Sequence, residues 1–157
     1  MASNPKYSLL EIERRWLVDL TKVENLDQCR FRHIEDRYIS GTRLRLRIIE
    51  EESKSAEYKL CKKYGKVSDW AEPITNLYLT EDEYKTFVLL PSATVDKLRY
   101  SVAEGAIDIY DPEGIAVYEV EFNAIEQANL YVPPPFVLQE VTSLEGYSGY
   151  SLATERT

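Results

Sequence analysis

Apolar and charged residues alternate along several short segments of the chain. Residues 42–49, for example, read Thr-Arg-Leu-Arg-Leu-Arg-Ile-Ile. Successive side chains of a β-strand point to opposite faces of the sheet, so this segment predicts a strand with one charged and one apolar face. By the same criterion we expect a mainly β chain, with strands at residues 7–20, 34–39, 42–49, 56–60, 74–79, 95–102, 106–110, 115–122 and 136–142.

Short helices are expected between some of these strands. Thr80 and Glu83 form a capping box, in which each side chain can bind the backbone N–H of the other residue. The box predicts a helix at residues 81–90 that ends at Pro91. Residues 124–130 suggest a second helix, residues 21–32 a short helix or turn, and the tail from residue 143 a loop or short helix. Without repeats or linkers, we expect one domain over residues 1–157, with a loose tail at residues 1–6.

The charged faces of the expected strands are sorted by sign. Some are mostly acidic and others mostly basic, whereas a surface that serves only solubility mixes the two. Two carboxylates on one face, about 7 Å apart along the strand, repel each other unless cations compensate them. Solvent-facing strips remain the alternative for any single strand. The faces comprise Glu11, Glu13 and Arg15; Arg43, Arg45 and Arg47; Glu57 and Lys59; Lys97 and Arg99; Asp108; and Glu119 and Glu121.

A closed antiparallel barrel accounts for all these faces together. The charged faces would point into the barrel, and the apolar faces would point outward, where a few helices cover them. Arginines and lysines in such a lumen could bind phosphates, and carboxylates could hold hard divalent cations. Burying so many charges is unfavourable unless they pair with each other, with metal or with a ligand. We therefore expect a mainly β, α+β fold built on a closed barrel with helices packed on its outside.

Composition excludes several other classes of function. The chain has 19 basic and 27 acidic residues, and the net charge of −8 argues against general binding to nucleic acid or anionic membranes. Two cysteines and one histidine form neither a disulfide framework nor a zinc-ligand pattern. The sequence shows neither a signal peptide nor a run long enough to span a membrane. We expect a cytoplasmic protein with no nucleic-acid or membrane partner.

Residues 11–15, Glu-Ile-Glu-Arg-Arg, resemble the ExExK motif that opens the CYTH superfamily, the triphosphate tunnel metalloenzymes. The resemblance continues in order over nearly the whole chain, through residues 43–45, 58–60, 74–79, 97–100, 107–110, 119–121 and 140–142. It implies an eight-stranded antiparallel tunnel that binds a triphosphate together with Mg²⁺ or Mn²⁺.

The resemblance also implies roles for individual residues. The catalytic set would be Glu11, Glu13 and Arg15, and a metal-activated water would attack the terminal phosphorus. Glu140 and Arg47 are weaker candidates for the site. The implied metal ligands are Glu11, Glu13, Asp108, Glu119 and Glu121, and the implied phosphate ligands are Arg15, Arg43, Arg45, Lys59, Lys97 and Arg99.

One position departs from the motif, since Arg15 stands where the family has lysine. Arginine keeps the positive charge but cannot lose its proton, so phosphate binding should survive while any role in activating water is in question. If Arg15 limits catalysis, Arg15→Lys should raise the rate.

The function expected first is metal-dependent hydrolysis of inorganic triphosphate or a small organic triphosphate, by a monomer or homodimer. The alternatives are a class IV adenylyl cyclase and a non-catalytic polyphosphate- or nucleotide-binding module.

Overall fold

The computed structural model describes residues 4–112 and 114–155. Strands are the main secondary structure of the described residues, which confirms the mainly β, α+β class expected from the alternation. The strands are β1 (Leu9–Val18), β2 (Phe31–Ile39), β3 (Leu44–Glu50), β4 (Glu57–Lys63), β5 (Ala71–Leu79), β6 (Ser92–Val102), β7 (Gly105–Asp111), β8 (Ile115–Phe122) and β9 (Val137–Glu140). The helices are α1 (Glu81–Phe87), α2 (Ile125–Leu130) and α3 (Gly149–Thr154).

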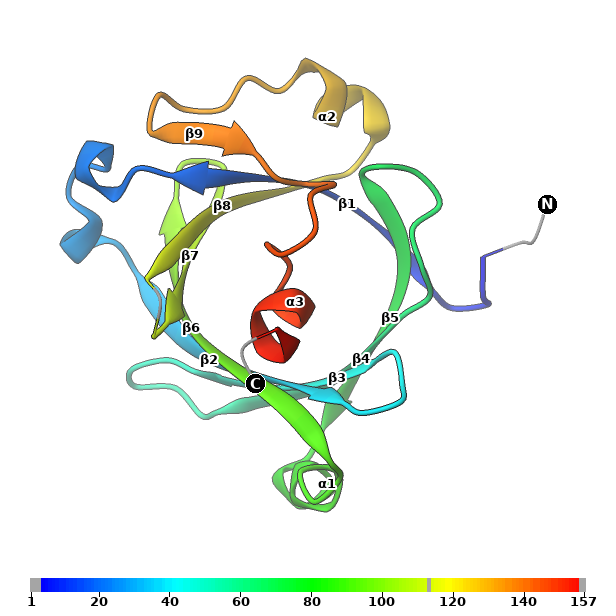
Figure 1. Cartoon of the computed structure of the whole chain (residues 1–157). Helices are drawn as coiled ribbons and strands as arrows, with labels where there is room; N and C mark the ends of the chain where they lie inside the picture. The colour runs from blue at the N-terminus through cyan, green and yellow to red at the C-terminus, as the bar shows by residue number, and fades with distance from the viewer. Residues whose placement is uncertain (1–3, 113, 156–157) are drawn as a thin grey trace.

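Eight of the strands close into an antiparallel barrel (Figure 1). The strand order is β5-β4-β3-β2-β6-β7-β8-β1, and β1 pairs with both β8 and β5. Its first half lies against β5, with Leu9 opposite Ile74, and its second half lies against β8, with Leu17 opposite Val117. The short strand β9 pairs with the end of β1 as a ninth strand. The closed barrel predicted from the charged faces is therefore confirmed.

Two of the helices cover the outside of the barrel, as expected. Leu46 and Leu60 pack against Tyr84 and Phe87 of α1, and Ile12 packs with Ala128 of α2. The capping box of α1 is present, because Thr80 N donates to the Glu83 carboxylate at 2.8 Å and Glu83 N donates to Thr80 Oγ1 at 3.2 Å. The apolar strand faces are thereby removed from water.

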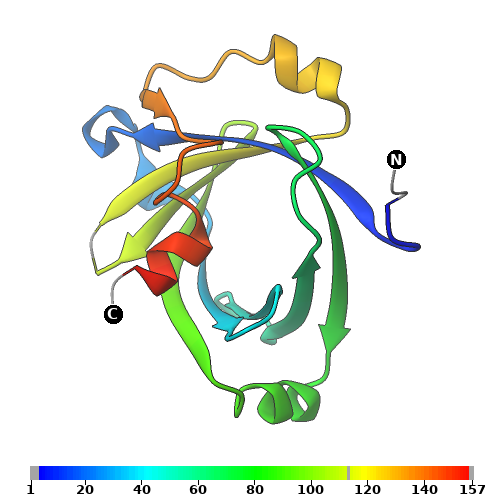
Figure 2. The ribbon, with the colours of Figure 1, turned by 45° about the vertical axis from the view of Figure 1, so that its right-hand side comes forward.

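The third helix lies across one end of the barrel (Figures 1 and 2). Its Leu152 and Ala153 are buried against inward-facing Val95 and Val117. Gly149 allows this approach, since a Cβ atom there would lie 2.3 Å from the Tyr38 hydroxyl oxygen. Unlike α1 and α2, this helix fills the lumen at one end with apolar side chains.

Several element boundaries differ from those expected. Residues 21–32 hold two short 3₁₀ turns, Leu20–Lys22 and Leu26–Gln28, separated by Asn25 in the left-handed conformation with φ 55°. The last strand is shorter than residues 136–142, while β2 and β4 are each three residues longer than expected at one end. Residues 1–3 of the expected tail lie outside the described part, and residues 4–6 form no helix or strand. Among the described residues, no helix is long and apolar enough to cross a membrane.

Candidate active site

The acidic residues of β1 and β8 meet inside the barrel, where Glu13 lies opposite Glu121 in the strand register. One carboxylate oxygen from each of Glu11, Glu13 and Glu121 lies within 4.8 Å of the others. We call these three residues the carboxylate cluster. Mg²⁺ and Mn²⁺ prefer such hard oxygen donors, so the residues present fit a divalent cation.

Burial and nearby negative charges raise the pKa values of two carboxylates of the cluster, Glu13 and Glu121. Burial, followed by the charges of Glu119 and Glu11, raises the pKa of Glu13 to about 8. Burial, followed by the charges of Glu11 and Glu119, also raises the pKa of Glu121 above its usual value. A divalent cation bound here would relieve this repulsion, so the cluster is electrostatically prepared for one.

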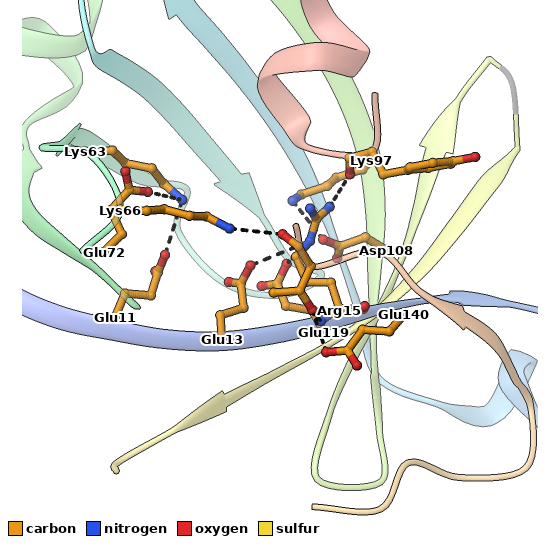
Figure 3. A network of polar contacts seen from close by, with 12 residues as sticks. Glu11, Glu13, Arg15, Lys63, Lys66, Glu72, Lys97, Asp108, Glu119 and Glu140 are labelled. Atoms are coloured by element: carbon orange, nitrogen blue, oxygen red, sulfur yellow. Dashed lines mark hydrogen bonds and ion pairs between the residues drawn. The ribbon is translucent and has the colours of Figure 1, made fainter. Parts of the chain in front are cut away.

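Lys63 is the cation that compensates the cluster in this structure (Figure 3). Its Nζ atom lies 3.2 Å from the Glu11 carboxylate and 3.9 Å from that of Glu72. Burial disfavours the charged ammonium, but Glu11 and Glu13 outweigh it and hold the pKa of Lys63 above its usual value. The sequence analysis missed this residue, because it expected the strand at residues 56–60 to end before Lys63. Continued alternation from Lys59 through Cys61 to Lys63 was the available signal.

Lys59, the lysine chosen from the sequence, makes different contacts. Its Nζ atom lies 2.8 Å from the Glu57 carboxylate and 5.1 Å from the centre of the Tyr78 ring. It also falls outside the residues that line the cavity described below. Within β4, the structure thus places Lys63 rather than Lys59 beside the carboxylate cluster.

The other expected metal and phosphate ligands pair with one another. Asp108 accepts from Lys97 Nζ at 2.8 Å and from Arg99 Nε at 2.7 Å, and Arg99 Nη2 also donates to Glu119 at 2.9 Å. Burial alone would raise the pKa of Asp108, but Lys97 and Arg99 outweigh it and hold this pKa below its usual value. The expected set of five metal ligands therefore divides into the carboxylate cluster and this ion-paired group.

The three arginines in and just before β3, Arg43, Arg45 and Arg47, are engaged to different degrees. Arg47 donates to both oxygens of buried Asp36, at 2.6 and 2.8 Å. Arg45 Nε is buried without a hydrogen-bond partner among the described residues, and Asp36 is 3.7 Å from it. Arg43 lies against Gly65 and lines the cavity. Asp36 escaped the sequence analysis because its strand face also carries Ile34 and Tyr38, which breaks the alternation.

A cavity of about 1000 Å³ joins these groups. It opens beside α3, between the β4–β5 loop and the C-terminal segment. Its polar lining includes two carboxylates of the cluster, Glu11 and Glu13, and several cations, among them Arg15, Arg43, Arg45 and Lys63. Negative and positive ligands thus face a common space.

Arg15 links the site to the C-terminal segment. Its Nε atom lies 3.6 Å from Glu13 and 3.7 Å from Glu119, while Nη2 donates to the backbone carbonyl of Tyr147. Its backbone N–H donates to Thr142 Oγ1 at 2.9 Å. The guanidinium therefore faces two carboxylates and holds the Tyr147 carbonyl, while the Arg15 backbone binds residues 141 and 142. Glu140, by contrast, accepts hydrogen bonds from Arg14, which points outward from β1. The Arg14 guanidinium also lies over the rings of Trp16 and Trp70.

Comparison with known proteins supports the fold. No family model and no curated protein matches the chain. Among solved structures, the inorganic triphosphatase NE1496 is 21% identical with a TM-score of 0.57, over 98% of this chain and 95% of that one. A further structure of NE1496, called a hypothetical protein, has a TM-score of 0.58 at 21% identity and covers 91% of this chain and 97% of its own. PH1819 from Pyrococcus horikoshii OT3 has a TM-score of 0.60 at 20% identity, over 92% of this chain and 96% of that one. The tunnel fold implied by the CYTH resemblance is confirmed.

The raised pKa of Glu13 predicts a pH-dependent stability. Between its ordinary value of 4.5 and about 8, the folded protein retains a proton that the unfolded chain has lost. Stability of the protein in EDTA should therefore fall as the pH rises across this window, and Glu13→Gln should remove that part of the fall. Thermal unfolding at several pH values measures it, with exposed Glu126→Gln as control. Parallel curves for wild type and Glu13→Gln would contradict the prediction.

The contacts of Arg15 predict that Arg15→Lys is harmful. One ammonium cannot reach Glu13, Glu119 and the Tyr147 carbonyl together, so the variant should lose about 1.5–3 kcal/mol of stability, as expected for a hydrogen bond to a charged group. Denaturant unfolding measures the loss, with exposed Arg30→Lys as control. Unchanged stability together with faster turnover would instead support the expectation drawn from the sequence.

Proposed function

We propose that this protein is a divalent-metal-dependent triphosphatase that removes the terminal phosphate of inorganic triphosphate or a small organic triphosphate. The observation that carries the proposal is the carboxylate cluster, two members of which, Glu11 and Glu13, line one cavity together with Arg43, Arg45 and Lys63. Phosphoryl transfer needs both elements, because cations must hold phosphate oxygens while a metal ion neutralises developing charge. The fold shared with an inorganic triphosphatase supports the same activity.

The cations that line the cavity define where phosphates would bind. Arg45 Nε is a buried donor without a partner among the described residues, and a phosphate oxygen would satisfy it. Arg43 adds a planar guanidinium at the cavity wall, suited to two parallel hydrogen bonds to a phosphate. Lys63 lies between these arginines and the carboxylate cluster, where it can contact the terminal phosphate.

The remaining charged residues would hold this arrangement in place. Mg²⁺ or Mn²⁺ on Glu11, Glu13 and Glu121 would neutralise phosphate charge and lower the pKa of water. Arg15 faces both Glu13 and Glu119, so its charge offsets the repulsion between them. The group formed by Lys97, Arg99 and Asp108 compensates Glu119 from the other side. Two alternatives remain. Cyclisation of ATP would release pyrophosphate, and a non-catalytic binding protein would release no product.

Removing one ligand of the carboxylate cluster should abolish metal-dependent turnover. Phosphate release from inorganic triphosphate, ATP and thiamine triphosphate is measured with and without Mg²⁺ or Mn²⁺. Glu121→Gln should lower the rate at least about a hundredfold, the order of magnitude that loss of one preorganised electrostatic group costs. It should also abolish the rise in melting temperature caused by Mn²⁺. Glu126→Gln is the control, and full activity of Glu121→Gln would remove this residue from the site.

The two lysines of β4 can be distinguished in the same assay. Lys63→Gln should lower kcat/KM about 10- to 100-fold, as expected for one charge-assisted contact to phosphate. Lys62→Gln is the matched control, since Lys62 is the exposed neighbour whose ammonium lies over the Tyr64 ring. A larger loss in Lys59→Gln than in Lys63→Gln would restore the assignment made from the sequence.

A further inference from the structure

One edge of β1 changes its pairing partner beside the carboxylate cluster. On this edge, β5 pairs with β1 as far as Ile12, and β9 pairs with it from Trp16 onward. Residues 13–15 lie between the two, and we call them the seam of the barrel. The seam carries both Glu13 and Arg15, so the backbone that positions these two side chains lies between two neighbouring strands.

Groups from two other segments complete the hydrogen bonds of the seam. Glu13 N donates to the Trp70 carbonyl of the β4–β5 loop at 2.9 Å. Arg15 N donates to Thr142 Oγ1 at 2.9 Å, and the Arg15 carbonyl accepts from Val141 N at 2.8 Å. The backbone position of the seam therefore depends on how the β4–β5 loop and the segment after β9 are held.

Arg14 contacts both of these segments from the outside of the barrel. Its Nε and Nη2 atoms donate to the two carboxylate oxygens of Glu140 at the end of β9, each at 2.8 Å. Its guanidinium carbon lies 4.6 Å from the centre of the Trp70 ring, and Nη1 donates to the Ala128 carbonyl of α2 at 2.7 Å. One planar group with several donors thus joins β9, α2 and the β4–β5 loop.

The contact between Arg14 and Glu140 continues to the backbone of Arg15. The Glu140 oxygen that accepts from Arg14 Nε also accepts from Thr142 Oγ1 at 2.9 Å. A hydroxyl that donates its hydrogen in this way keeps its lone pairs for an incoming N–H, and Thr142 Oγ1 accepts from Arg15 N. The ion pair outside the barrel is thereby linked to the strand that carries the site.

We propose that Arg14 and Glu140 are positioning residues, which hold the seam and thereby fix Glu13 for a divalent cation. The proposal rests on the proposed function, of which a cation on the carboxylate cluster is a part. Mg²⁺ tolerates little departure from octahedral geometry, so a small shift of the Glu13 backbone would weaken binding. Removing a residue that orients a metal ligand without touching the metal typically costs about 10- to 100-fold in affinity or activity.

The test measures Mn²⁺ affinity by calorimetry in the absence of substrate. Arg14→Gln should lower the affinity about tenfold or more, because the β4–β5 loop and the segment after β9 lose their common partner. Arg37→Gln is the matched control, since Arg37 Nε also donates to a carboxylate, that of Glu35 on β2, at 2.7 Å. The control should change the affinity less than about twofold, as expected for a site without shared partners.

A second measurement separates positioning from a general loss of stability. In Arg14→Gln without metal, amide hydrogen exchange should become faster at Glu13 and Arg15 than in the rest of the barrel, because the opening is local. If Arg14→Gln does not fold, Glu140→Gln and Arg14→Lys provide the same comparisons, since each keeps part of the contact. In the double variant Arg14→Gln/Glu140→Gln, or Arg14→Lys/Glu140→Gln, the loss of affinity should be smaller than the two single losses combined, because both residues act through one contact.

Two results would overturn the role of Arg14 and Glu140. One is unchanged Mn²⁺ affinity in the folded variants, and the other is hydrogen exchange that rises equally throughout the barrel. Failure of the proposed function looks different, because the wild-type protein would then bind Mn²⁺ but release no phosphate from inorganic triphosphate, and the affinity comparison would still decide the positioning role. A wild-type protein that does not bind Mn²⁺ would reject both proposals.

Discussion

Charge compensation inside the barrel is the constraint on which the rest of the structure depends. Acidic and basic side chains from β1, β2, β3, β6, β7 and β8 point inward, and each must find an opposite charge, a ligand or water. Deep in the lumen the charges match, as where Arg47 binds both oxygens of Asp36. Nearer the cavity the match is incomplete, because Lys63 and Arg15 face the three carboxylates of the cluster and Arg15 is shared with Glu119. Arg45 Nε also has no hydrogen-bond partner among the described residues. The mismatch is therefore confined to the place where a metal and a phosphate would meet.

The strand register determines which charges are matched. Arg99 lies opposite Asp108 in the β6–β7 pair, so their side chains share one face and meet directly. Glu13, by contrast, lies opposite Glu121 across β1 and β8, which brings like charges together. Like charges at such a position are destabilising on their own. A cation bound there would offset this repulsion, which makes the carboxylate cluster a stronger metal candidate than Asp108 and Glu119, whose charges are already paired.

The sequence was sufficient to predict the barrel because its strands alternate cleanly. Arg43, Arg45 and Arg47 could be assigned to one face from spacing alone, and the structure places them in the lumen together. Two inward-facing charged residues were not predicted. Asp36 was missed because its strand face mixes apolar and charged residues, and Lys63 was missed because the expected strand ended at residue 60, whereas β4 continues to Lys63. The sequence also could not position α3, since an apolar helix face does not reveal whether it covers the outside of a barrel or its end. Ion pairing such as that of Lys97 with Asp108 depends on register, which spacing within one strand cannot give.

Arg15 shows why a single residue of a motif has to be interpreted with its surroundings. From the sequence, arginine in place of lysine suggests a weakened catalyst. In the structure, the planar guanidinium makes a set of contacts that one ammonium could not make, because it faces two carboxylates and also donates to the Tyr147 carbonyl. That carbonyl belongs to the segment that leads into α3, and residues of this segment line the cavity. Arginine at position 15 therefore couples the orientation of the carboxylates to the placement of the C-terminal segment beside the cavity.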